Sequence, residues 1–415
     1  MLLRLAFASL LARRITVGLT IVAIALSVGL ILGVEKVRNG ARASFANTIS
    51  NTDLIVGARS GSVQLLLYSV FRIGNATNNI TWQTYQDLAS RPEVAWIVPI
   101  SLGDSHRGFR VMGTTADFFD RYKFRSGQSL SFANGDPFSD VFDAVLGADV
   151  AAKLGYRLDD DIVVAHGLAS FSEHKDKPFR VAGVLEKTGT PVDRTVLVSL
   201  EGIEAIHVDW QGGARSGPAI SAKAARQMEL TPKAVTAAMI GVTSRLKVFT
   251  LQRAINEYPE EPLLAILPGV ALQELWGIVG IAEIALVGVS ALVVATALLG
   301  MAAMIFSGLN ERRREMAIFR AVGAGPGTIF MMLMLEALLL TCIGIGAGVA
   351  LLYTGLLIAR PYIDAAYGLY LPITGLSAHE LTVLGAVLVA SVVISILPAA
   401  RAYRLSVADG MTVQI

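Results

Sequence analysis

Residues 300–330 read GMAAMIFSGLNERRREMAIFRAVGAGPGTIF, two apolar runs separated by a compact block of charge. The charged side chains of this block are Glu311, Arg312, Arg313, Arg314, Glu315 and, one turn further on, Arg320. Apolar runs of this kind are typical of membrane-spanning helices, and arginines between them are typical of a loop on the cytoplasmic side. The stretch therefore predicts two spanning helices joined by a short charged segment.

The composition of the whole chain agrees with a membrane protein. Of 415 residues, 53% are hydrophobic and only 16% are charged, and the mean hydropathy is +0.58, which is too apolar for an ordinary soluble protein. The net charge of +2 gives no indication of nucleic-acid binding. The single cysteine, Cys342, excludes an intrachain disulfide.

Four apolar runs are long enough to cross a bilayer, at 15–34, 284–309, 329–359 and 381–400. We therefore expect an α-helical membrane protein with four transmembrane helices plus a large α+β extracytoplasmic domain inserted between helices 1 and 2. The expected segments are a cytoplasmic amphipathic N-terminus (1–14), helix 1 (15–34), the extracytoplasmic domain (35–272), a stalk with helix 2 (273–309), a cytoplasmic coupling helix (310–327), helix 3 (328–359), an extracytoplasmic loop (360–380), helix 4 (381–400) and a cytoplasmic tail (401–415).

The distribution of Lys and Arg predicts the orientation. Arginines without any acid precede the first helix, and further arginines follow the second helix and occur in the tail. The loop after the third helix has only Arg360 against two acids. By the positive-inside rule both termini and the charged block are cytoplasmic. A cleaved signal peptide ending near ARAS (41–44) is the alternative for the first run, but that site lies too far beyond an apolar run that is itself too long.

The segment 35–272 has the alternating pattern of an α+β domain, with room for two lobes and a core of its own. The expected strands are DLIVGA (53–58), VAWIVPI (94–100), GFRVMG (108–113), DIVVAHG (161–167), FRVAGVL (179–185) and RTVLVSL (194–200), and the expected helices are TWQTYQDLASRP (81–92), LGADVAAKLGY (146–156) and the stretch around TPKAVTAAM (231–239).

No catalytic or metal site is assigned to this domain. It has no cysteine and no G-x-S-x-G or H-E-x-x-H motif. His106, His166, His174 and His207 lack the paired spacing of metal ligands. SEHKD (172–176) is expected to be a solvated loop rather than a ligand cluster.

The charged block is expected to form a short cytoplasmic helix that ends at the glycine-rich GAGPG (323–327). Arginines beside apolar residues also serve as anchors on lipid headgroups. A simple anchor does not need Ile318 and Phe319 followed by Arg320 and the glycine Gly323, however. A groove in a partner protein explains that combination better.

NERRREMAIFRAVGAGPGTIFMMLMLEALLL (310–340) resembles the cytoplasmic loop and third helix of MacB/FtsX-type ABC transporter permeases, including lipoprotein-releasing and macrolide-exporter permeases. PAARAYRLSVADGM (398–411) is similar to the end of that family. FRVMGTTADFF, LSFANGDPF, DAVLGADVAAKLG, DIVVAHG and FRVAGVLEKTG occur in the family's order. The resemblance covers most of the chain.

This resemblance implies that the charged block is a coupling helix docked on a separate ATPase. The sequence has no G-x-x-x-x-G-K-[ST] loop, so the chain is not expected to be an enzyme or to bind a cofactor, and ATP and Mg belong to the partner. Two permeases and two ATPases form the working unit, most simply with a permease homodimer and otherwise with a heterodimer. Further expected partners are membrane lipids and a periplasmic or outer-membrane protein. The expected location of this chain is the bacterial inner membrane.

A helix from about Leu272 to Leu309 would be about 57 Å long, longer than the hydrocarbon core of about 30 Å. Such a rod suits mechanotransmission, in which ATP hydrolysis moves the outer domain. The expected function is to extrude or extract a lipophilic, lipoprotein or peptide-like substrate. The alternative is an FtsX-like module that transports nothing and regulates an extracytoplasmic hydrolase or sensor.

Two acids in the spans and two glycines complete the expectations. Glu283 and Glu336 are costly in lipid and so indicate a role. The alternative for Glu283 is a position in the stalk outside lipid. For Glu336 the expected role is a buried hydrogen-bonded contact, and the alternative is an interfacial position. Gly344 and Gly348 form a small-xxx-small face for close helix packing, either within one bundle or across a dimer.

Overall fold

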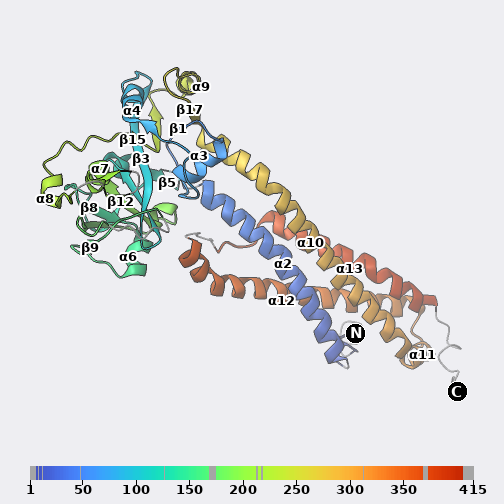
Figure 1. The fold of residues 1–415 in the computed structure, drawn as a ribbon. Coiled ribbons are helices and arrows are strands. Elements are labelled where there is room, and N and C mark those ends of the chain that lie inside the picture. Colours follow the sequence, from blue (N-terminus) through green and yellow to red (C-terminus); the bar gives the residue numbers. More distant parts are fainter. Residues whose placement is uncertain are drawn as a thin grey trace. The chain divides into compact units, whose positions relative to one another are not determined.

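The computed structural model describes residues 6–7, 9–11, 13–46, 48–125, 127–167, 174–211, 214–215, 218–311, 313–367 and 373–404. The chain divides into two compact units (Figure 1). The helical unit contains residues 1–40, 280–361 and 372–415, and the α+β unit contains residues 41–279 and 362–371.

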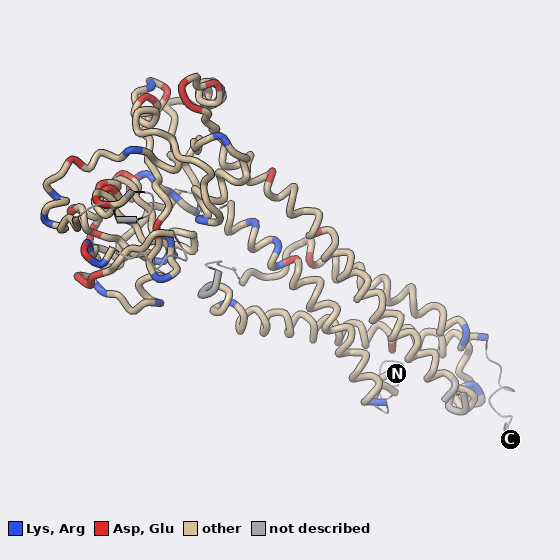
Figure 2. Tube along the Cα trace, in the orientation of Figure 1, with Lys and Arg blue, Asp and Glu red and all other residues tan. Residues whose placement is uncertain are grey.

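Four helices of the described chain are long and apolar enough to cross a membrane. Their bounds are α2 (Arg14–Ala46), α10 (Pro268–Glu311), α12 (Pro326–Tyr367) and α13 (Ala378–Arg404), and the short α11 (Arg313–Ala321) lies between α10 and α12 in the chain. Figure 2 shows that charged residues are sparse along these helices compared with the α+β unit. This finding confirms the expected number of apolar helices, and α10, with 44 residues, is longer than the helix from Leu272 to Leu309 that was predicted for the second.

The start of α13 is fixed by a capping box. The backbone N–H of Ser377 donates to Glu380 Oε2 at 2.6 Å, and the N–H of Glu380 donates to Ser377 Oγ at 3.2 Å. Glu380 is buried and also forms an ion pair with Lys36 Nζ at 3.1 Å. The spacing S-x-x-E was visible in the sequence, but its partner on α2 was not.

The α+β unit is built on one mixed sheet. Among the residues that the structure describes, this sheet has 11 strands in the order β17-β1-β16-β3-β4-β12-β8-β11-β7, with β10 paired to β3 and β9 paired to β11. The strands of this sheet are β1 (Leu54–Ala58), β3 (Val94–His106), β4 (Phe109–Thr114), β7 (Phe132–Gly135), β8 (Asp143–Leu146), β9 (Asp161–Ile162), β10 (Ala165–His166), β11 (Phe179–Leu185), β12 (Thr195–Ser199), β16 (Ala237–Val242) and β17 (Leu263–Ile266).

The remaining elements surround this sheet. Short two-stranded ribbons are formed by β2 (Ile80–Thr81) with β15 (Ala234–Val235), β5 (Lys123–Phe124) with β6 (Gln128–Ser129), and β13 (Trp210–Gln211) with β14 (Ala214–Arg215). The helices are α3 (Ser62–Ser69), α4 (Trp82–Ala89), α5 (Asp117–Arg121), α6 (Ala148–Leu154), η1 (Pro191–Arg194), α7 (Leu200–His207), α8 (Ala222–Ala225), η2 (Arg245–Lys247) and α9 (Val248–Asn256).

Both faces of the sheet are covered, which explains the continuous apolar runs of its strands. On β12, Val196 and Val198 point into one core cluster and Leu197 into another. All five residues of β12 are buried. The sheet therefore has a core on each side, as a domain of this size can form without disulfides.

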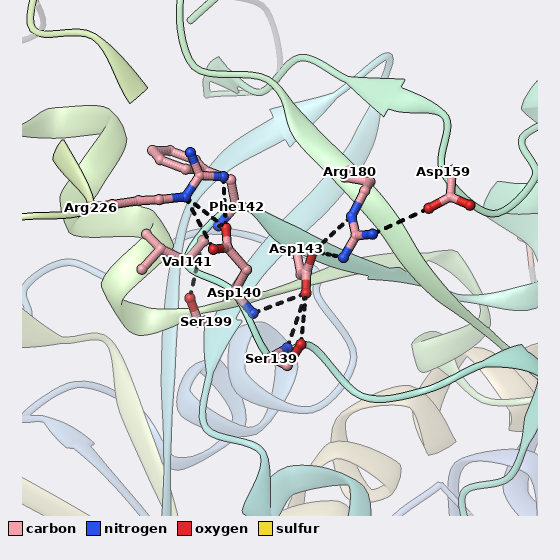
Figure 3. A network of polar contacts seen from close by, with 9 residues as sticks. All are labelled: Ser139, Asp140, Val141, Phe142, Asp143, Asp159, Arg180, Ser199 and Arg226. Carbon is pink, nitrogen blue, oxygen red and sulfur yellow. Dashed lines mark hydrogen bonds and ion pairs between the residues drawn. The ribbon is translucent and has the colours of Figure 1, made fainter. Parts of the chain in front are cut away.

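A polar network supports the start of β8 (Figure 3). Asp143 Oδ2 accepts from the backbone N–H groups of Ser139 (3.1 Å) and Asp140 (2.9 Å), and its Oδ1 accepts from Arg180 of β11 at 2.9 Å. Arg226 donates to Asp140 at 2.8 Å. The network ties the 139–143 loop to β11 and to the end of α8.

Two local predictions are wrong. The stretch 161–167 was expected to be one strand, but it forms the two-residue strands β9 and β10, which pair with β11 and β3 respectively. The stretch 231–239 was expected to be helical, but it forms β15 and the start of β16. Alanine has the highest helix propensity, but propensity is only a weak guide to structure. Pairing of Ala238 with Pro99 and of Met239 with Val98 places it in the middle of the sheet, where tertiary contacts override the propensity.

Candidate functional site

The short helix α11 carries Arg313, Arg314, Glu315, Ile318, Phe319 and Arg320 of the predicted coupling residues and ends in a defined turn, whereas Glu311 is the last residue of α10. Gly323 has φ +99, a conformation that favours glycine. The N–H of Ala324 donates to the carbonyl of Phe319 (2.9 Å), and that of Gly323 to the carbonyl of Arg320 (3.0 Å). This pair of bonds is the Schellman motif, so Gly323 ends the helix as its sequence suggested.

The faces of α11 differ in exposure. Met316 and Ala317 are buried in the helical unit, whereas Ile318 is 56% exposed and Val322 is 83% exposed. Phe319 is half-buried. Two large apolar side chains are therefore open on the surface of a charged helix.

Arg320 connects α11 to the end of α13, where its guanidinium donates to the carbonyl of Tyr403 at 3.3 Å. Arg312 lies outside the described residues. The same holds for the side chains of the other charged residues of the block, which are Glu311, Arg313, Arg314 and Glu315.

The two glycines of the small-xxx-small face lie against α2 of the same chain. A Cβ added to Gly344 would meet Ile24 Cγ2 at 2.6 Å, and one added to Gly348 would meet the carbonyl oxygen of Ala25 at 2.8 Å. Glycine at both positions therefore permits the close approach of α12 to α2. Of the two arrangements left open by the sequence, the glycines pack within one bundle.

The two predicted membrane acids differ in their surroundings. Glu336 of α12 is 4% exposed and accepts a hydrogen bond from the Ser9 hydroxyl at 3.2 Å. Glu283 of α10 is half-buried and is not without a polar or electrostatic partner. A buried carboxyl group in an apolar bundle is costly unless it is hydrogen-bonded.

A groove lies between α2 and α10 within the helical unit. It has a volume of about 600 Å³ and is lined by small and apolar side chains, including Leu19, Ala23, Leu26, Ala297 and Met301. Only 6% of an apolar 18-residue stretch of α10 is buried within the chain, against 44% of the corresponding stretch of α12. The groove was not predicted, because it depends on which faces of two distant helices meet.

The exposed side chains of α2 form one stripe. Ile15, Leu19, Val22 and Leu26 are all more than half exposed, and their spacing of three to four residues places them on one face of the helix. Residues of the opposite face, such as Ile24 and Val28, are buried in the bundle. The stripe continues the apolar surface of the groove.

The fold also brings together three of the four histidines that the sequence left scattered. His166, His174 and His207 lie close to one another in the α+β unit. His174 is fully buried, so the expectation of a solvated loop is wrong at that position, and residues 172 and 173 lie outside the described residues.

Sequence comparisons place these features in a family. Residues 17–242 match the model of the MacB-like periplasmic core domain, and residues 287–407 match that of the FtsX-like permease C-terminal domain. The chain belongs to the MacB/FtsX-type ABC transporter permeases. Members of this family are membrane components of ABC-type systems and work with an ABC ATPase.

Two solved structures are similar to parts of the chain. The periplasmic region of MacB from Actinobacillus actinomycetemcomitans is 12% identical and aligns over 55% of this chain and 94% of its own, with a TM-score of 0.35. The extracellular domain of the noncanonic ABC-type transporter YknZ from Gram-positive bacteria is 12% identical over 52% of this chain and 99% of its own, with a TM-score of 0.31. No curated protein sequence matches the chain significantly.

Proposed function

We propose that this chain is a permease subunit that transmits the ATP-driven motion of a separate ATPase to an extracytoplasmic α+β domain. The observation that carries the proposal is the continuity of α10, a single helix of 44 residues from Pro268 to Glu311 that is about 66 Å long. Its first residues belong to the α+β unit and its last lead directly into α11. Motion of α11 can therefore be passed along one rigid element.

The contact with the ATPase is proposed to be the exposed face of α11. Ile318 and Val322 offer apolar surface to a partner groove, and the Schellman turn at Gly323 holds this face in place. Both termini and α11 lie on the cytoplasmic side in this proposal, and the chain binds no nucleotide itself.

The test of this contact is co-purification with the ATPase. Ile318→Asp, alone and with Phe319→Asp, places charge in an apolar contact and should weaken binding by several kcal/mol, on the order of the cost of burying an unpaired charge or polar group. Leu246→Asp is the matched control, because Leu246 is 91% exposed in the α+β unit. Retention of the ATPase by the Ile318→Asp variant would contradict the proposal.

The working assembly is proposed to be a permease homodimer with α2 and α10 at its centre. Both helices keep large apolar surfaces uncovered within one chain, and the groove between them offers space of about 600 Å³. Cysteines at Ile15, Leu19, Val22 or Leu26 in a Cys342→Ser background should crosslink two chains. Cysteines at the buried Ile24 should not, and a uniform or absent pattern in the presence of the ATPase would argue against this dimer.

The substrate class is proposed to be lipophilic, such as a lipid-anchored protein or an apolar peptide. The apolar lining of the groove favours transport over pure regulation, since a regulator needs an exposed docking surface rather than a cavity. Ala297→Trp should fill the groove, abolish transport in reconstituted vesicles and leave ATPase binding intact. Unchanged export by this variant would favour the regulatory function.

A further inference from the structure

Three histidines from separate segments of the α+β unit meet next to Asp104. His166 belongs to β10, and His207 is the last residue of α7. His174 is the first residue of the 174–177 turn. One potential ligand atom from each ring lies within 4.8 Å of the others. Asp104 Oδ1 lies 3.3 Å from His166 Nδ1 and 3.7 Å from His207 Nε2.

The backbone explains why Asp104 and His166 face each other. They are directly opposite residues of the antiparallel pair β3/β10, so their side chains lie on the same face of the sheet. The pairing of β3 with β4 is irregular between Leu102 and Ser105. A β-bulge changes the direction of a side chain relative to the regular up-and-down alternation along a strand. The irregular part of β3 includes Asp104.

The tautomer of His207 is fixed by its own helix. Its Nδ1–H donates to the carbonyl oxygen of Ile203 at 2.7 Å, which leaves a lone pair on Nε2. That atom lies 3.2 Å from His166 Nδ1. In a tetrahedral zinc site with Zn–N bonds of about 2.0–2.1 Å, two ligand nitrogens are about 3.3 Å apart. The observed spacing matches that of neighbouring zinc ligands, and without a metal it lets His166 Nδ1–H donate a hydrogen bond to His207 Nε2.

His174 is fully buried, and among the residues that the structure describes neither of its ring nitrogens has a hydrogen-bond partner. Buried polar groups without partners are rare and costly in folded proteins. An imidazole nitrogen that has no hydrogen-bond partner can donate its lone pair to a metal ion.

His106 shows how a structural histidine differs in the same unit. Its Nδ1 is bonded to the carbonyl oxygen of Val163 at 2.6 Å and its Nε2 to the Tyr156 hydroxyl at 3.0 Å. Described protein groups thus satisfy both nitrogens of His106 and neither nitrogen of His174. This contrast leaves the lone pair of His174 available to a ligand such as a metal ion.

We propose that Asp104, His166, His174 and His207 bind one Zn²⁺ ion. Three imidazole nitrogens and one carboxylate form a four-coordinate donor set that suits zinc. Because protein atoms supply all four donors, the site is structural and joins β3, β10, α7 and the 174–177 turn.

Groups around the site hold the ligands in position. Lys177, which is fully buried, forms an ion pair with Asp209. The other carboxylate oxygen of Asp209 accepts from the N–H of Ile220 at 3.2 Å. This pair fixes the turn after His174 against the segment after His207, as supporting residues do around known metal sites.

The experiment uses the full-length protein in detergent, stripped with EDTA and titrated with ZnCl₂ alone. We expect one zinc per chain by elemental analysis, and Co²⁺ in its place should give the visible absorption of a four-coordinate ion. His174→Ala and His207→Ala should each lower the zinc affinity at least about 100-fold, since even supporting residues cost 10- to 100-fold. His379→Ala is the control, because His379 belongs to the helical unit.

Absence of stoichiometric zinc in the wild type, or an affinity unchanged in His207→Ala, would overturn the proposal. If His174→Ala does not fold, Asp104→Asn and His166→Ala provide the same test. The readout needs no ATPase and no transport, so its failure leaves the proposed permease function unaffected.

Discussion

Replacing Gly348 by alanine tests the close packing of α12 on α2. The added Cβ would lie 2.8 Å from the carbonyl oxygen of Ala25 and 2.9 Å from Val28 Cβ, whereas ordinary contacts begin at 3.4 Å. The backbone of Ala25 cannot rotate away as a side chain can. The two helices must therefore separate by about 0.6 Å at this point.

The cost follows from the contacts that such a separation weakens. A gap of 0.5–1 Å loses about a quarter to a half of the dispersion energy of each affected atom pair, and overpacking typically costs about 1–3 kcal/mol. We expect Gly348→Ala to lower the thermal unfolding midpoint of the detergent-solubilised protein by several degrees.

Gly346→Ala is the matched control on the same helix. Apart from its chain neighbours and the backbone of its own helix, no described residue has an atom within 4 Å of a Cβ at this position. Alanine is also the better helix former by up to about 1 kcal/mol. Its unfolding midpoint should be equal to the wild type or slightly higher. The reasoning is refuted if Gly348→Ala is as stable as Gly346→Ala.

Three further predictions concern charge and topology. Lys36→Met leaves Glu380 buried without its ion-pair partner and should destabilise the protein by about 3 kcal/mol, measured by thermal unfolding. Burial alone would raise the pKa of Asp143, but N–H donors and a guanidinium outweigh it and lower the pKa. Its stabilisation is thus present above the unfolded pKa near 4 and is lost as the pH falls through the folded value, so the deficit of about 2 kcal/mol expected for Asp143→Asn at pH 7 should shrink in acid. In the Cys342→Ser background, an impermeant maleimide should label Leu246→Cys but not Val322→Cys in intact cells, and the reverse would contradict the orientation.

The sequence predicted the elements that have a local cause. Four apolar runs predict four apolar helices, and the strands at 94–100, 179–185 and 194–200 were recognised from their β-branched residues. The end of α11 at Gly323 follows from the positive φ that glycine adopts easily after the last turn of a helix. These features need only a few neighbouring residues.

Features that depend on tertiary contacts were not predictable in this way. The helix expected around 231–239 is a strand because its pairing partners lie far away in the chain. Asp104 and His166 are 62 residues apart in sequence, and only the register of β3 with β10 makes them neighbours. No spacing rule for metal motifs covers such a pair.

The uninterrupted apolar run of α10 has a consequence for its behaviour in a bilayer. From Ile284 to Leu309 the helix has no charged residue and extends about 39 Å, about 9 Å more than the hydrocarbon thickness. In the proposed topology it can tilt, or shift along its axis, without moving charge into lipid. Hydrophobic mismatch costs only fractions of a kcal/mol per Å. We therefore expect the bilayer to offer little resistance to tilt or axial movement of this helix. The activity of the protein should then vary little between thin and thick membranes.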